Sequence, residues 1–284
     1  MRDRTRTTAA VVGGAVVSVL TVLSLGTVRW NHETGRVVRR LSGTDHDDAL
    51  GARISPAELN TLPRPVQRYF HFALAPGQRR IRGARVTHRG EFQSAPWQWN
   101  AFTSTEYLAV HPPGFVWDAN IRMAPLLSVH VRDSYMDGQG SMQASAAAVL
   151  TMMDREGTPE LAEAALQRWL GEAVWLPTAL LPMAGVRWEG IDDRAARATI
   201  RDRGIEASLL FQFGDHGEIE RCSGDRYRDL DGGPELTPWE GRFGEYTRMH
   251  GMMIPACGEA AWLASAGRDP YWRGQITSVD YDFE

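Results

Sequence analysis

Three aspartates lie on neighbouring segments that the sequence predicts as strands or the turn after them: Asp118, Asp133 and Asp137. Two carboxylates held on adjacent strands can act as general acid and base when their surroundings separate their pKa values. The same residues can instead pair with arginines, and Asp137, followed by Gly138, can form a hairpin turn. The residue pattern favours these structural roles, so we predict no catalytic residues.

Glu172 lies at the border of the apolar stripe of a predicted helix, close in sequence to Trp169 and Trp175. It can anchor the polar head of a ligand, or it can form an i,i+4 ion pair with Arg168. Both roles stay open at the level of sequence.

Ten tryptophans are spread along the chain. Each one taken singly suits an ordinary core, but a sheet that carries so many can also line an apolar cavity, where the indole offers surface area and an N–H donor. The residues that we predict to bind a ligand are Trp97, Trp99, Trp117, Trp169, Glu172, Trp175, Trp188 and Phe211.

Several reaction classes are excluded because all 31 residues counted as lysine or arginine are arginine. Phosphate-binding loops, Schiff-base enzymes and kinases each need a lysine. The sequence also lacks Gly-x-Ser-x-Gly, His-Glu-x-x-His, Cys-x-x-Cys and Gly-x-Gly-x-x-Gly. We therefore expect no cofactor and no metal site, and we rank binding above catalysis.

The elements that must position these residues follow from periodicity. Helical spacing and flanking prolines predict a helix after Pro63 that ends at residues 76–77. Period-two runs and turn signals then predict strands on both sides of a helix at residues 159–176, for which Thr158 is the N-cap. Roughly ten to twelve antiparallel strands result. The predicted fold class is α+β, a large curved antiparallel sheet resembling a half-barrel and packed on a central helix.

The amino-terminal segment predicts a membrane anchor. Residues 7–28 carry no charge, and a helix of about 20 apolar residues spans a bilayer. A cleaved signal peptide is the alternative. We predict a head at residues 1–6, a transmembrane helix at 7–28, a basic linker at 29–54 and one soluble domain at 55–284. The lipid bilayer is then a partner of a single-pass protein, with the domain on the extracytoplasmic side.

Charge divides the rest of the chain unevenly. Residues 36–89 hold 11 arginines and four acidic residues, whereas residues 90–284 hold 16 arginines and 29 acidic residues. The basic part can lie against anionic lipid headgroups or be a solvated surface. The acidic part argues against nucleic acid as a partner. Cys222 and Cys257 could form a disulfide or stay as two free thiols.

Six motifs together resemble a bacterial family of uncharacterised membrane-anchored proteins. They lie at residues 62–69, 90–92, 114–119, 133–140, 172–180 and 238–239. This resemblance implies no established activity and no catalytic residues. The order of strands, helix and strands behind an export signal is also similar to lipoprotein-carrier (LolA-like) and mycobacterial lipoprotein half-barrels, whose curved sheet wraps helices around an apolar cavity. The chain departs from them because it has no lipobox cysteine.

Together these patterns predict a membrane-anchored protein that binds a lipid or another lipophilic ligand between its sheet and its central helix. A structural or assembly protein of the cell envelope is one alternative. An enzyme with a carboxylate-based site, at Asp118, Asp133 or Glu172, is the other.

Overall fold

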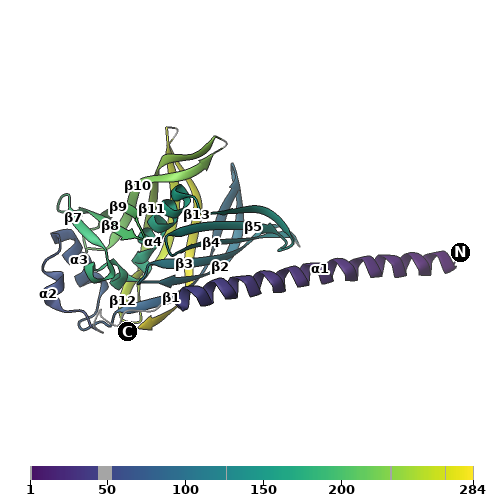
Figure 1. Cartoon of the computed structure of the whole chain (residues 1–284), viewed down its shortest axis with the longest axis horizontal. Coiled ribbons are helices and arrows are strands. Elements are labelled where there is room, and N and C mark those ends of the chain that lie inside the picture. Colours follow the sequence, from purple (N-terminus) through teal and green to yellow (C-terminus); the bar gives the residue numbers. More distant parts are fainter. Residues whose placement is uncertain (1, 44–52, 126, 231, 266, 284) are drawn as a thin grey trace.

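Thirteen antiparallel strands form one continuous sheet in the part of the chain that the structure describes (Figure 1). The computed structural model describes residues 2–43, 53–125, 127–230, 232–265 and 267–283, without the side chains of residues 2–20. The strand order across the sheet is β6-β5-β4-β3-β2-β1-β13-β12-β11-β10-β9-β8-β7. The strands are β1 (Ile81–Ala95), β2 (Gln98–Ala109), β3 (Gly114–Ala124), β4 (Leu127–Met136), β5 (Gln139–Ala146), β6 (Leu150–Glu156), β7 (Arg187–Gly190), β8 (Ala195–Asp202), β9 (Ile205–Phe213), β10 (Ile219–Leu230), β11 (Gly233–Met249), β12 (Met252–Ala264) and β13 (Gly267–Phe283).

The topology is an antiparallel meander. Strands β1–β6 run from the middle of the sheet to one edge, and strands β7–β13 run from the other edge back to the middle. Every strand is paired in antiparallel fashion with a neighbour in sequence, and the first and last strands meet in the middle of the sheet, where Val86 lies opposite Val279. The two edge strands, β6 and β7, are consecutive in sequence and flank the central helix. The predicted antiparallel sheet is confirmed, and it contains more strands than expected.

Helix α4 (Pro159–Glu172) runs inside the curve of the sheet. It begins where the Thr158 hydroxyl accepts a hydrogen bond from the backbone N–H of Leu161, with Pro159 in the first turn. Its apolar face buries Leu166, Trp169 and Leu170. Because α4 packs on β3–β5 and also on β9–β10, which lie far apart in the strand order, the sheet must curve around it. The half-barrel packed on a helix is therefore confirmed.

Short helical elements lead into strands β1 and β7. Three 3-10 turns, η2 (Ala173–Trp175), η3 (Pro177–Leu180) and η4 (Pro182–Ala184), lead the chain from α4 to β7, and most of their residues are buried. Helices α2 (Pro56–Leu59) and α3 (Arg64–Ala73) precede β1. The predicted helix after Pro63 is α3, which buries Val66, Tyr69 and Phe70 against the core.

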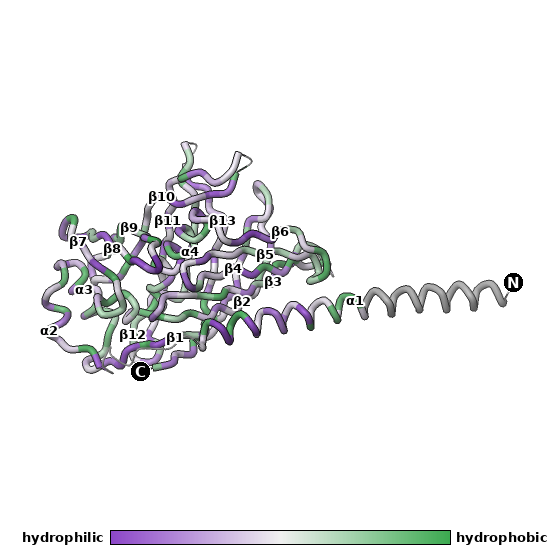
Figure 2. Tube along the Cα trace, viewed as in Figure 1, coloured by the Kyte–Doolittle hydropathy of each residue, from purple (hydrophilic) through white to green (hydrophobic). Residues whose placement is uncertain are grey.

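Helix α1 (Arg2–Ser42) extends away from the sheet at its amino-terminal end (Figure 1). Its carboxyl-terminal part mixes hydrophilic and hydrophobic residues (Figure 2) and packs on β2 and β3, where Leu41 and Val116 are buried together. Residues 29–42, predicted as a linker, are thus helical, and residues 44–52 lie outside the described residues. The reason is that Val37, Val38 and Leu41 supply an apolar stripe that the charge count concealed.

The membrane prediction has a different outcome. The predicted span at residues 7–28 falls within α1, but the side chains of residues 7–20 lie outside the described part. Among the residues whose side chains are described, no helix is long enough and apolar enough to cross a bilayer. The transmembrane helix of the predicted fold is therefore not supported.

One strand was missed. The sequence predicts a single strand at residues 142–150, whereas the structure has β5, a turn and β6. Strand β6 is an edge strand that is exposed along nearly its whole length, so its residues show no alternation of buried and exposed positions. A strand without a buried face leaves no period-two signal in the sequence.

Candidate functional site

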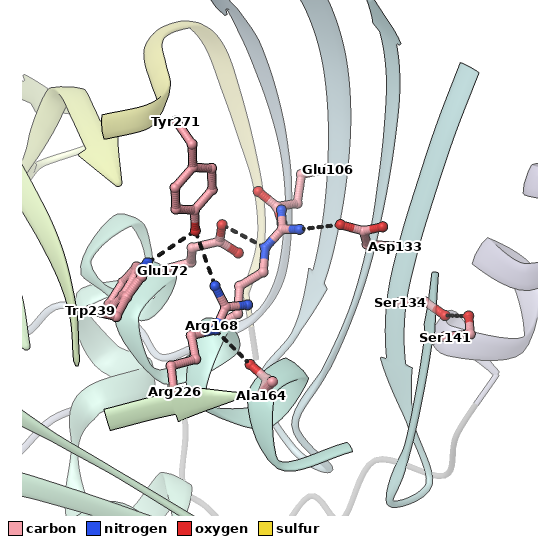
Figure 3. A network of polar contacts seen from close by, with 10 residues as sticks. All are labelled: Glu106, Asp133, Ser134, Ser141, Ala164, Arg168, Glu172, Arg226, Trp239 and Tyr271. Carbon is pink, nitrogen blue, oxygen red and sulfur yellow. Dashed lines mark hydrogen bonds and ion pairs between the residues drawn. The ribbon is translucent and has the colours of Figure 1, made fainter. Parts of the chain in front are cut away.

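Arg168 stands at the centre of a cluster of buried charges between α4 and the sheet (Figure 3). Its Nη1 donates to Asp133 Oδ2 at 2.9 Å and its Nη2 to Glu106 Oε1 at 3.2 Å. Its Nε donates to Glu172 Oε1, one helical turn away, at 2.9 Å. One guanidinium thus joins three carboxylates from α4, β2 and β4.

The local structure explains why these side chains converge. Asp133 on β4 alternates with Val131 and Tyr135 and therefore shares their inward face. Glu106 on β2 occupies the inward face beside Leu108. Arg168 and Glu172 are four residues apart on α4 and so lie on one side of the helix.

Burial shapes the acidity of the cluster. The Glu106 side chain is 1% exposed, and burial, reinforced by Glu172, raises the pKa of Glu106 well above its ordinary value. Burial also raises the pKa of Asp133, although Arg168 opposes this shift. For Arg168 burial alone would lower the pKa, but Glu172, Glu106 and Asp133 together raise it. The guanidinium therefore stays charged while the carboxyl groups compete for it.

Several buried polar atoms in this region have no hydrogen-bond partner among the described residues. Each carboxylate of the cluster has one such oxygen: Glu106 Oε2, Asp133 Oδ1 and Glu172 Oε2. The indole nitrogens of Trp117 and Trp175 are also unpartnered. Buried polar groups in folded proteins are nearly always hydrogen-bonded, so these atoms mark a part of the core where the described residues leave hydrogen-bonding capacity unused.

A cavity of about 630 Å³ adjoins the cluster. Its wall comes from α4 and from strands of both halves of the sheet, and it includes Asp133, Arg168 and Glu172. Most of the wall is aromatic or aliphatic. The large aromatic side chains on it include Trp117, Trp175, Trp239, Trp262, Tyr271 and Trp272. The volume lies within the range of about 300–1,000 Å³ that is typical of sites for small molecules.

A second polar group faces the same cavity. The Tyr271 hydroxyl accepts hydrogen bonds from Arg226 Nη1 at 3.1 Å and from Trp239 Nε1 at 3.0 Å (Figure 3). Arg226 also donates to the backbone oxygen of Ala164, and its guanidinium lies over the ring of Trp239. A phenol oxygen has two acceptor positions and one proton to donate. Both acceptor positions are occupied, which leaves the O–H of Tyr271 as a donor.

His88 on β1 borders the cluster without joining it. Its ring lies 4.8 Å from that of Trp175, and burial, together with Arg168, lowers the pKa of His88 to about 3. The imidazole is therefore neutral at physiological pH.

The eight residues predicted to bind a ligand do not lie together in the structure. Trp117, Glu172 and Trp175 lie on the cavity wall. The other five do not line it. Trp97 is 92% exposed, Trp169 and Phe211 are buried in the core, and Trp188 packs on Phe211. Trp99 lies under the guanidinium of Arg273, which is 3.9 Å from the ring centre.

The pair of carboxylates that the sequence left as the less favoured alternative is not formed. In the register of β3 with β4, Asp118 lies opposite Arg132 and Trp117 opposite Asp133, so Asp118 and Asp133 point to opposite faces of the sheet. Asp118 accepts a hydrogen bond from Trp30 Nε1 at 2.9 Å. Asp137 sits in the turn and pairs with Arg40 at 2.9 Å. The ion pair of Glu172 with Arg168, weighed from the sequence, is present.

Sequence reasoning missed Glu106, Arg226 and Tyr271 as members of the site. Glu106 carried one usable signal, because it is the single charged residue between residues 98 and 109. A lone charge on the apolar face of a strand must find a partner inside the fold. Arg226 and Tyr271 meet across 45 residues, and no local pattern marks that contact.

Other regions of the described chain are less suited to a ligand. A hollow of about 650 Å³ lies between α1 and strands β4–β6, but its wall is mainly polar and includes exposed arginines such as Arg29.

Cys222 and Cys257 are free thiols. Within the described residues, no group of three or more histidine, cysteine or acidic side chains is placed to hold a metal ion.

Three solved structures are similar to this chain in fold. A LolA superfamily protein from Nitrosomonas europaea is 10% identical, with a TM-score of 0.36 over 78% of this chain and 93% of the other. A porin-like protein from Bacteroides uniformis is 10% identical, with a TM-score of 0.26 over 72% and 98%. A β-barrel-like protein of the domain of unknown function DUF1849 from Brucella abortus is 9% identical, with a TM-score of 0.23 over 72% and 99%. Likenesses at this level do not extend to function.

The two sequence comparisons give different results. Among curated proteins no match is found. A family model, in contrast, matches residues 60–281, which include α4 and all the strands apart from the last two residues of β13. The chain therefore belongs to the Family of unknown function (DUF6920).

Proposed function

We propose that this protein binds a lipophilic ligand in the cavity between α4 and the curved sheet. The observation that carries the proposal is the cavity itself, about 630 Å³ with a mainly apolar wall that is rich in aromatic side chains. A ligand that covers apolar surface inside a cavity stabilises the complex by about 25 cal/mol per Å² of surface removed from water. The polar atoms at the Arg168 cluster would fix the orientation of the ligand, as a few polar groups do in such sites.

Displacement of a neutral hydrophobic dye tests this function. Full-length protein mixed with N-phenylnaphthylamine should give bright, saturable fluorescence, and dodecanol should reverse it. Ala260 on β12 lines the cavity and is half-buried. We expect Ala260→Leu to weaken dye binding about tenfold, because the added side chain occupies space that the ligand needs.

Ala101→Leu is the matched control. Ala101 on β2 is exposed and follows Asn100, whose side chain is buried, so it lies on the other face of the sheet. This variant should bind the dye like the wild type. A wild-type protein that takes up no dye, or equal effects of the two variants, would refute a ligand site in this cavity.

The bilayer as a partner, and a domain on the extracytoplasmic side, remain proposals from the sequence. They rest on the uncharged residues 7–28. Separation of cell membranes from soluble protein tests the attachment, and a protease added outside intact spheroplasts tests the side. Full-length protein in the soluble fraction would contradict the attachment.

A further inference from the structure

The three carboxylates of the cluster offer more acceptor atoms than the protein uses. Arg168 takes one oxygen from each of Glu106, Asp133 and Glu172. The other oxygen of each is buried without a partner among the described residues. Asp133 and Glu172 line the cavity, and Glu106 lies next to Glu172. An ionised carboxylate accepts hydrogen bonds but donates none.

Arg168 has little capacity left for an anionic ligand. Each of its three nitrogens donates to a carboxylate. Its guanidinium also lies 4.8 Å from the ring centre of Phe115 and 5.0 Å from that of Trp117, so aromatic rings cover it. An acid such as a fatty acid would have to compete with three carboxylates that the protein already holds in place.

The other nearby cation does not restore the balance. Arg226 acts on Asp133 through its charge, but its nitrogens donate to Tyr271 and to the backbone of Ala164. Even when Arg226 is counted with Arg168, three carboxylates face two guanidinium groups. Buried charges need partners, so in the free protein Glu106 holds a proton, and a bound cation can take the place of that proton.

Neutral donors complete the environment. Trp175 is 2% exposed and Trp117 is 3% exposed, both line the cavity, and the indole nitrogen of each is unpartnered in the described structure. Aromatic faces attract cations, and such cages recognise ammonium groups in proteins. The N–H groups suit an uncharged oxygen atom next to the cation.

We infer that the ligand is a cationic amphiphile whose ammonium head is bound by Asp133 and Glu172, with Glu106 beside them, and whose apolar chain fills the cavity. The inference rests on the proposed function, because it names the class of ligand for the same cavity. The ammonium replaces the proton on Glu106 and donates to the unpartnered oxygens of Asp133 and Glu172, which line the cavity. Charge-assisted hydrogen bonds of this kind are about twice as strong as neutral ones.

Binding should then be coupled to protons. The groups that face Glu106 are Arg168 and Glu172 on α4, Asp133 on β4 and the neutral His88 on β1. Burial favours the protonated form of Glu106 in the free protein, whereas an ammonium head favours the ionised form. The affinity for the amine should therefore rise with pH while the amine remains protonated.

Competition among ligands with the same chain tests the inference. Full-length protein loaded with N-phenylnaphthylamine is titrated with dodecyltrimethylammonium, dodecylamine, dodecanol and dodecanoate below their micelle concentrations. We expect dodecylamine to displace the dye at about one tenth of the concentration of dodecanol or less, and dodecanoate to be the weakest. Because the permanently charged ammonium cannot lose a proton, its pH dependence reports on the protein alone.

Two variants locate the effect. Glu172→Gln keeps the shape of the side chain and removes its charge, so it should reduce the preference for dodecylamine over dodecanol several-fold. Glu206→Gln is the control, because Glu206 on β9 is exposed, pairs with Arg201 and does not line the cavity. It should leave the preference unchanged.

The outcomes separate the two proposals. Equal displacement by dodecylamine and dodecanol would overturn the cationic head while the lipophilic site stands, and so would stronger displacement by dodecanoate. Failure of every ligand to bind would refute the proposed function itself. The ranking of ligands on the wild-type chain decides the matter even if Glu172→Gln does not fold.

Discussion

Two clusters of charged side chains lie on opposite faces of the same sheet, and their central and surrounding charges have opposite signs. On the inner face Arg168 is shared by Glu106, Asp133 and Glu172. On the outer face Glu240 is shared by Arg221, Arg242 and Arg268, with N–O distances of 3.5, 2.6 and 2.9 Å. Glu240 lies between Trp239 and Gly241 on β11, both of which line the cavity, so its side chain points the other way.

The difference lies in where the surplus charge is placed. The surplus arginines of the outer cluster reach water, since Arg242 is 51% and Arg221 44% exposed. The surplus carboxylates of the inner cluster are mostly buried, each with an oxygen that has no partner in the described structure. In the described structure the outer cluster has one buried unpartnered atom, Nη2 of Arg268, whereas every carboxyl group of the inner cluster has one. The inner cluster balances its charge only with a proton on Glu106 or with a further cation. This contrast distinguishes a structural network from a binding site.

The largest effect should come from removing the central arginine. Arg168→Met would leave three buried carboxylates without their shared cation, and breaking a buried ion pair costs about 3–5 kcal/mol. Arg242→Met on the outer face should cost at most about 1 kcal/mol, because Glu240 keeps two other arginines. Urea denaturation of both variants measures the free energy of unfolding. Equal losses would show that the two clusters do not differ as we describe.

Much of the fold could be predicted from the sequence because it depends on local alternation. The alternation within residues 205–213 predicts a strand, and the structure has β9 at Ile205–Phe213. Its alternate residues Leu209, Phe211 and Phe213 are buried, which is the pattern that period-two reasoning detects. Asp133 was likewise assigned correctly to the apolar face of its strand.

The site could be predicted only in part because it depends on contacts between distant segments. Arg168 and Glu106 are 62 residues apart, and no spacing rule joins them. Period-two alternation predicts Trp97 and Trp99 on one strand face, but Trp97 has a positive φ of 65° in the turn before β2 and is exposed to solvent. A turn interrupts the alternation, so the side chain next to it loses its predicted face.

A smaller and opposite pair of effects should appear when stability is measured against pH. The pKa of Glu106 is raised in the folded protein, so the folded state holds a proton that the unfolded state releases. The stabilisation is complete below the unfolded pKa of about 4.3 and is lost as pH rises through the folded pKa, at about 1.4 kcal/mol per pH unit. Glu106→Gln should therefore gain stability relative to the wild type as pH rises, leaving the similar slope of Asp133 in place.

Glu240 should behave in the reverse sense. Burial alone would raise its pKa, but Arg268 and Arg242 lower it below the ordinary value. Its contribution is present above the unfolded pKa and is lost as pH falls through the folded pKa. Glu240→Gln should thus be less stable than the wild type at neutral pH and approach it in acid. Urea denaturation at a series of pH values measures both variants, and slopes of the same sign would contradict the inverse arrangement.

The smallest effect concerns tryptophans inside and outside the sheet. Trp169 on α4 donates from Nε1 to the backbone oxygen of Ala109 at 2.9 Å, and this bond ties the helix to the end of β2. Trp169→Phe keeps the ring in the core but removes the donor, and the loss should be about 1–2 kcal/mol. Trp97→Phe should cost nothing measurable, because its side chain is already exposed to water. If thermal unfolding shows the two variants to be equally stable, the hydrogen bond to Ala109 does not hold α4 in place, and the position of Arg168 must depend on its carboxylates alone.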